Sequence, residues 1–239
     1  MTTKEQLKPS LTRDIRIQSK KNQERGDRTS YDGCKWSTYG EHFSSYDKSF
    51  NGVLERSIHT LLRKKKSLKI IDFMGPSGTI ATLFERFPKK PMFGVAVSLS
   101  DLRSDEERKR DERLNVKQTS GDILKSSTWD QIEEQLQGHK ADLIMERAHA
   151  GFWCIPVSLR LYAILLNRAW GLLSEETGVL IAEVPTHFQS EAKRMIDSFR
   201  KNNKMDASTG KSSYDGGLYI KIVKTNDSPK KLPFPTLKE

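Results

Sequence analysis

The most informative stretch for the fold is LKIIDFMGPSGTIATLFERF, residues 68–87. It begins with a short apolar run that ends on an acid, Asp72, and a turn containing Gly75 and Gly78 follows. Apolar residues then recur at the three- and four-residue spacing of a helix. A strand, a glycine turn and a helix in this order are typical of the first unit of an α/β nucleotide-binding fold, in which glycine lets a ligand approach the main chain.

Two phosphate-binding patterns are excluded at this turn. It is not G-x-G-x-x-G, and no Lys follows the second glycine as a P-loop requires. A turn that merely connects a strand to a helix is the alternative reading of these residues. The patterns in the rest of the chain distinguish a ligand-binding turn from a turn that only connects two elements.

On both sides of this stretch, the apolar residues alternate between the spacing of a strand and the spacing of a helix. The predicted strands after the first are 92–100, 114–119, 141–146, 178–183 and 217–223, with a weaker one near 204–208 that forms a hairpin with the last. The predicted helices are 50–62, a charged one in 101–113, one around 129–136, 156–173 and 187–201. This order predicts buried parallel strands joined by crossover helices, an α/β fold.

The two ends of the chain differ in composition from its middle. Residues 1–49 form a basic and aromatic extension, in which positions 7, 11 and 15 allow a short amphipathic helix. Aromatic residues crowd 31–50, Tyr39 among them, and we expect them either to stack on a base or to pack as a lid over the domain. Residues 226–239 contain three Pro, so we expect a flexible tail.

Length and composition limit the function. The chain has 239 residues, enough for one α/β domain, and a net charge of +10, which favours an anionic partner such as RNA but also suits a soluble basic enzyme. Its two Cys form no C-x-x-C pair, so we expect no metal site and a reducing, cytoplasmic location. The longest apolar stretch, 155–173, is interrupted by two Arg and an Asn, so we expect no membrane span.

At this point the ordered motifs resemble the class I S-adenosylmethionine (SAM)-dependent methyltransferases. KIIDFMGPSG resembles their first motif, FGVAVSLSD their second strand, SGDIL their acidic turn, ADLIME their fourth strand and YDGGLYIKIVK their terminal hairpin strand. The resemblance covers about residues 50–225 and implies a SAM-binding domain there. The implied fold is a three-layer, Rossmann-like, mostly parallel seven-stranded sheet with a terminal antiparallel strand, here with an N-terminal helical extension.

The resemblance also implies a set of site residues by position. The expected contacts to SAM are Asp72, Gly75, Ser77, Gly78, Ser98, Asp101, Asp122 and Ile123. Glu146 or His149, after the fourth strand, would act as a general base. Tyr39, Phe152, Trp153 and His187 would line the acceptor site. The alternatives are an ordinary loop histidine for His149 and a packing residue for Trp153.

Two departures from the family pattern keep a second hypothesis open. Met74 and Pro76 replace part of the glycine turn, and Ala96 stands where the family usually has an acid that binds the ribose. We expect Ser98, Ser100 or Asp101 to substitute for it. If none does, cofactor affinity should fall, since the loss of a charge-assisted hydrogen bond costs about 1.5–3 kcal/mol. The sequence therefore predicts methyl transfer to an O or N acceptor, on RNA or on a small molecule, or else a degenerate methyltransferase fold that binds a partner without catalysis.

Overall fold

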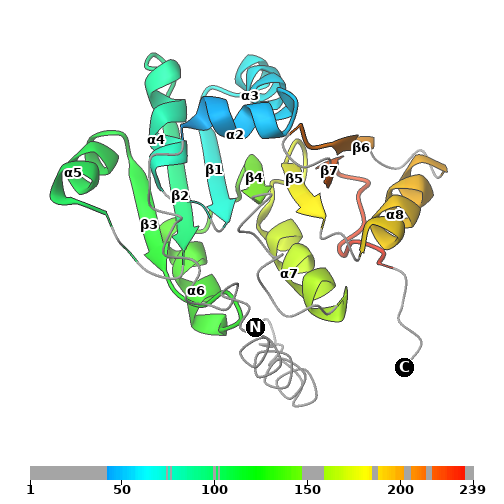
Figure 1. The fold of residues 1–239 in the computed structure, drawn as a ribbon. Coiled ribbons are helices and arrows are strands. Elements are labelled where there is room, and N and C mark those ends of the chain that lie inside the picture. The colour runs from blue at the N-terminus through cyan, green and yellow to red at the C-terminus, as the bar shows by residue number, and fades with distance from the viewer. Residues whose placement is uncertain are drawn as a thin grey trace.

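The computed structural model describes residues 42–73, 75, 77–98, 101, 103–146, 159–184, 188–201, 206–213 and 217–234. Within these residues the chain alternates strands and helices (Figure 1). The strands are β1 (Leu68–Phe73), β2 (Met92–Ser98), β3 (Val116–Ser120), β4 (Leu143–Glu146), β5 (Val179–Val184), β6 (Asp206–Lys211) and β7 (Leu218–Val223). The helices are α2 (Phe43–Ser49), α3 (Val53–Lys64), α4 (Ser77–Arg86), α5 (Asp105–Arg113), α6 (Ser126–Gln135), α7 (Leu159–Leu172) and α8 (Gln189–Lys201).

The strands form one seven-stranded sheet in the order β3-β2-β1-β4-β5-β7-β6. The first five strands run parallel, and β7 is antiparallel to both β5 and β6. The expected fold class is therefore confirmed: the chain has the three-layer fold of the class I SAM-dependent methyltransferases. The arrowheads of β1, β2 and β3 point to one edge of the sheet in Figure 1, and ligands of open α/β sheets bind beyond this carboxyl edge.

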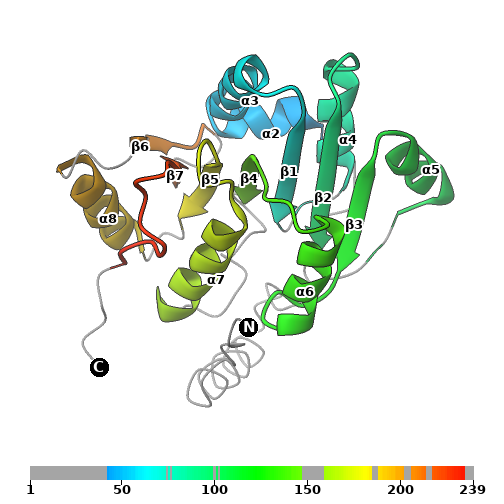
Figure 2. The ribbon, with the colours of Figure 1, turned by 180° about the vertical axis from the view of Figure 1, so that it is seen from behind.

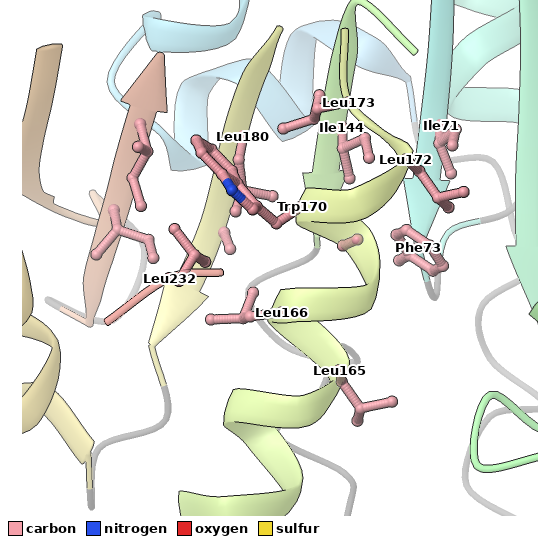
Figure 3. Packing of buried hydrophobic residues seen from close by; sticks show 14 of the residues in the cluster. Ile71, Phe73, Ile144, Leu165, Leu166, Trp170, Leu172, Leu173, Leu180 and Leu232 are labelled. Atoms are coloured by element: carbon pink, nitrogen blue, oxygen red, sulfur yellow. The ribbon is translucent and has the colours of Figure 1, made fainter. Parts of the chain in front are cut away.

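Helices cover both faces of the sheet, because the central strands are apolar on both sides. One core cluster joins the sheet to α2, α3 and α4, and the other joins it to α6, α7 and α8. Figure 2, the view from behind, shows α6 and α7 in front of the sheet and α2 and α3 beyond it. Figure 3 shows the second cluster, which includes Trp170 of α7, Leu180 of β5 and Leu232. No helix among the described residues is both long and apolar enough to span a membrane.

The charged segment after β2 folds as the expected helix. Ser104 caps α5 by accepting a hydrogen bond from the backbone N–H of Glu107, and the Glu107 side chain accepts one from the Ser104 backbone N–H. This reciprocal capping box satisfies two N–H groups that have no partner within the helix. The helix has one buried residue, Asp111, and the cap therefore adds to a helix with little apolar packing.

The described parts of both chain ends pack on the domain. Helix α2 lies in the N-terminal extension, and Phe43, Tyr46 and Phe50 are buried in the core, which agrees with the packing alternative for the aromatic cluster. The described part of the C-terminal segment, 226–234, also contacts the domain. Its Leu232 is buried, and the Pro229 carbonyl accepts a hydrogen bond of 2.9 Å from the Trp170 indole. Residues 1–41 and 235–239, including the helix expected near residue 11, lie outside the described residues.

Candidate active site

The turn after β1 brings the main chain against a buried acid. Asp72 is fully buried, and a Cβ atom added at Gly75 would lie 2.0 Å from its Oδ2 atom. Real Cβ atoms do not approach an oxygen so closely, so only glycine fits at this position. Ser77 begins α4 and is buried, and Gly78 lies in the same first turn, half-buried. The four expected residues of the turn therefore lie together.

The Asp72 carboxylate has one hydrogen-bond donor among the described residues. The Tyr46 hydroxyl donates to Oδ1 over 3.4 Å, whereas the buried Oδ2 atom has no hydrogen-bond partner in the described part of the chain. Burial raises the pKa of Asp72 well above its ordinary value; the Tyr46 hydrogen bond opposes this and the charge of Glu146 adds to it. A buried acceptor without a donor is costly, so this atom is suited to meet a ligand.

Two further acids lie at the ends of the neighbouring strands. Glu146 is the last residue of β4 and Glu183 the penultimate residue of β5, and both side chains are buried. The backbone N–H of Glu183 donates to the Glu146 carboxylate over 3.1 Å. We call Asp72, Glu146 and Glu183 the acidic edge. Among the described residues no group of three or more acids, His or Cys is placed to hold a metal ion.

Two buried tyrosines flank the acidic edge, one on each side of the sheet. Burial, followed by the charges of Asp72, Glu146 and Glu183, raises the pKa of Tyr46 well above its ordinary value. Tyr162 of α7 donates a hydrogen bond of 2.9 Å to the Glu183 carbonyl, and burial together with Glu146 and Glu183 raises its pKa. Both phenols therefore stay protonated and act as donors at neutral pH.

The end of β2 is built differently from the family pattern. Ala96 is fully buried two residues before the strand ends, so a ribose-binding acid has no counterpart there. Ser98, the last residue of β2, is buried and accepts a hydrogen bond of 2.8 Å from the Gln118 amide. Asp101 forms two hydrogen bonds of 2.9 Å with the Arg103 guanidinium, one to each oxygen, and these lower its pKa to about 2. Asp101 is thus already paired.

The turn after β3 is fixed by its own hydrogen bonds. Asp122 accepts a bond of 2.9 Å from the Leu124 N–H through its side chain, and one of 2.7 Å from the Thr128 hydroxyl through its carbonyl. The Trp129 indole donates to the Ile123 carbonyl over 2.7 Å. A side chain at Gly121 would meet the Thr128 hydroxyl at 2.5 Å. Asp122 and Ile123 are therefore held in a defined place at the carboxyl edge.

Sequence reasoning anticipated part of this arrangement and missed part of it. Tyr39, His149, Phe152, Trp153 and His187 lie outside the described residues, so their places stay predictions. The two tyrosines and Glu183 were missed. A Glu inside the otherwise apolar run 179–184 was the available signal, because a buried strand rarely contains an unneeded acid.

No protein-family model matches this chain, and no curated protein does. Among solved structures, it is similar to a predicted ribosomal RNA methyltransferase from Plasmodium falciparum, with a TM-score of 0.47 and 17% identity over 72% of this chain and 93% of that one. It is also similar to 1,6-didemethyltoxoflavin-N1-methyltransferase from Burkholderia thailandensis (TM-score 0.45, 11% identity, 94% and 93% covered).

A third similar structure is longer than this chain. NSun6 from Pyrococcus horikoshii has a TM-score of 0.43 and 16% identity over 73% of this chain, which spans only 52% of that protein. The fold assignment rests on the strand order and strand directions of the sheet itself.

Proposed function

We propose that this protein is a SAM-dependent methyltransferase whose cofactor binds at the carboxyl edge of the sheet. The observation that carries the proposal is the Asp72–Gly75 contact. The Asp72 carboxylate is buried, one of its oxygens has no donor among the residues that the structure describes, and the main chain of Gly75, which has no side chain, covers it. SAM offers an ammonium group, a ribose diol and a neutral adenine, so it needs acceptors and close main chain rather than a phosphate cradle.

The residues of this edge suit the cofactor in two of three places. Asp72, with Gly75, Ser77 and Gly78, would hold its methionine part, and the fixed turn of Asp122 and Ile123 would hold its adenine. The ribose position departs from the family pattern. Since both Asp101 oxygens are bound by Arg103, we assign the ribose to Ser98 rather than to Asp101.

When bound, SAM supplies a methyl group activated by a sulfonium. The chain itself positions the acceptor and takes its proton, and positioning accounts for most of the rate in such a displacement. The Glu183 N–H orients the Glu146 carboxylate, which we assign as the general base for an acceptor O–H or N–H, with His149 as the second candidate. Tyr39, Phe152, Trp153 and His187 would line the acceptor site.

For the acceptor, the net charge of +10 supports RNA, with a small molecule as the other class. A transfer assay with radiolabelled SAM on total RNA and on a metabolite mixture tests the activity. We expect label in one fraction, and a loss of about 100-fold or more in Glu146→Gln, since general base catalysis contributes about 10²–10⁴-fold. Binding of RNA that is absent at moderate salt, or that does not weaken with added salt, would exclude RNA.

A degenerate fold that binds a partner without methyl transfer is the second candidate. Its support is Ala96, whose buried methyl group takes the place of the ribose-binding acid. Biological activity that survives Asp72→Ala unchanged would favour this candidate over the enzyme.

A further inference from the structure

Helix α2 is fixed to the rest of the fold at both ends. At its start, the Phe43 N–H donates to the Thr82 hydroxyl of α4 over 2.9 Å. At its end, the carbonyl of Lys48 accepts a bond of 2.6 Å from the hydroxyl of Ser213, which follows β6. The Ser213 N–H adds a bond of 3.1 Å to the Ser49 carbonyl. Helix α2 is therefore anchored against the core at both of its ends, and it lies beside α4 in Figure 1.

Aromatic contacts fix the position of the Tyr46 ring on helix α2. The ring packs edge-on against Phe50 with 5.3 Å between centroids, and Phe50 packs in the same way on Tyr219 of β7 at 5.5 Å. Tyr46 is 3% exposed, so its ring cannot turn away into solvent. These contacts hold the ring where its hydroxyl reaches Asp72.

We propose that Tyr46 is a positioning residue of the ligand site: its hydroxyl holds Oδ1 of Asp72, so that Oδ2 is the oxygen presented to the ligand. The inference rests on the proposed function, because it names what prepares Asp72 for the cofactor. The distance of 3.4 Å exceeds the 2.7–2.8 Å common for O–H···O bonds, and contacts of this kind often shorten when a ligand binds.

The charges around Asp72 give Tyr46 a second effect. Among the described residues, the titratable groups acting on Asp72 are Tyr46 from α2 and Glu146 from β4; Glu183 from β5 acts on Tyr46. Ala96, beside it on β2, brings no charge. The Tyr46 hydrogen bond lowers the pKa of Asp72 against burial. Its loss therefore raises that pKa further, and a higher pH is needed to ionise the carboxylate.

Tyr46→Phe tests the proposal, because it removes the hydroxyl and keeps the ring that packs on Phe50. Tyr162→Phe is the matched control: it removes another buried hydroxyl, whose bond goes to the Glu183 carbonyl and not to Asp72. The dissociation constant of SAM is measured by calorimetry from pH 5 to 9 in both variants and in the wild type. Denaturant titrations establish that each variant is folded.

We expect Tyr46→Phe to weaken SAM binding about tenfold at neutral pH, as for the loss of one hydrogen bond to a charged group, and to move the binding midpoint to higher pH. Tyr162→Phe should leave the midpoint in place. Binding within twofold of the wild type with an unmoved midpoint would overturn the proposal and leave Tyr46 as a packing residue.

A measurement without SAM distinguishes a failure of the Tyr46 proposal from a failure of the proposed function. The carboxyl carbon of Asp72, followed by NMR in the wild type and in Tyr46→Phe, reports its titration directly. We expect the midpoint to rise in the variant. If the wild type binds no SAM, the proposed function fails and the ligand-positioning role fails with it, whereas an unmoved carboxyl titration shows that Tyr46 does not hold Asp72 at all.

Discussion

Ala96 of β2 lies opposite Asp72 of β1 in the parallel register, and both side chains are fully buried. The family resemblance places an acid at the Ala96 position, but here a second carboxylate would enter the core beside Asp72. The small, uncharged Ala96 side chain therefore fits its buried position beside Asp72. Replacing Ala96 by an acid should not restore the family pattern.

Ala96→Asp should destabilise the protein by about 2–4 kcal/mol, because it buries a carboxylate beside another acid without a partner. Urea unfolding measures the change. Lys117→Asp is the control, since it puts an acid on an exposed position of the neighbouring β3 strand. If Ala96→Asp were as stable as the wild type and bound SAM more tightly, our account of the β2 end would be wrong.

The raised pKa of Asp72 predicts how the ligand-free protein responds to pH. The folded state keeps the proton to a higher pH than the unfolded state, so stability falls as pH rises from the unfolded pKa, about 4, through the folded value. Asp72→Asn should remove the decrease in the free energy of unfolding that comes from ionising Asp72. The variant should therefore be more stable than the wild type at neutral pH. Free energies of unfolding at several pH values check this; equal pH profiles in both proteins would refute it.

Arg103 bridges two acids after β2. It pairs with Asp101 and donates over 2.9 Å to Asp111, whose side chain is buried. Arg103→Gln should cost about 3 kcal/mol, because it removes the nearer of two arginines that pair with the buried Asp111; the other, Arg110, lies 3.8 Å from the carboxylate. Arg108→Gln, a change at an exposed arginine of the same segment, should cost much less in the same denaturation experiment.

The same network predicts an acid-side effect. The pKa of Asp101 is depressed to about 2, so its stabilising contribution is present above pH 4 and is lost as pH falls toward 2. Arg103→Gln should flatten this decline. An unchanged slope between pH 4 and 2 in the variant would mean that Asp101 is not held by Arg103 in solution.

The C-terminal segment should contribute to stability through Leu232. This side chain is 3% exposed, and its backbone N–H donates to the Asn167 side chain over 2.6 Å. Leu232→Ala should cost about 2–5 kcal/mol, the usual range for a truncated core leucine. Pro233→Ala, at the next and exposed position, is the control. A loss below 0.5 kcal/mol would show that the segment detaches from α7 in solution.

Much of the fold follows from local patterns in the sequence. The apolar runs of β1, β2 and β5 mark strands buried on both faces, and the helix α3 shows the spacing of an amphipathic helix. The exact strand order does not follow from these patterns, because pairing depends on tertiary packing. What the family resemblance added was the expectation of a mostly parallel seven-stranded sheet with a terminal antiparallel strand.

The site could be predicted where residues follow strand ends, as Asp72, Asp122 and Glu146 do. Tyr46 could not be placed in this way, since its role depends on α2 crossing to a strand 26 residues later in the chain. Its neighbours Phe43 and Phe50 share a helical face with it, but the aromatic cluster was interpreted as a lid or a stacking surface. Leu232 was missed because prolines nearby obscure any periodic pattern.

Calorimetric titration with SAM tests whether the cofactor binds at Asp72. Asp72→Asn is the site variant, and Asp105→Asn, a change at an exposed acid of α5, is the control. Our account predicts saturable binding to the wild type and the control, and its loss in Asp72→Asn while the variant stays folded. Absence of wild-type binding up to about 1 mM SAM, equivalent to about −4 kcal/mol, would contradict it, as would undiminished binding to Asp72→Asn.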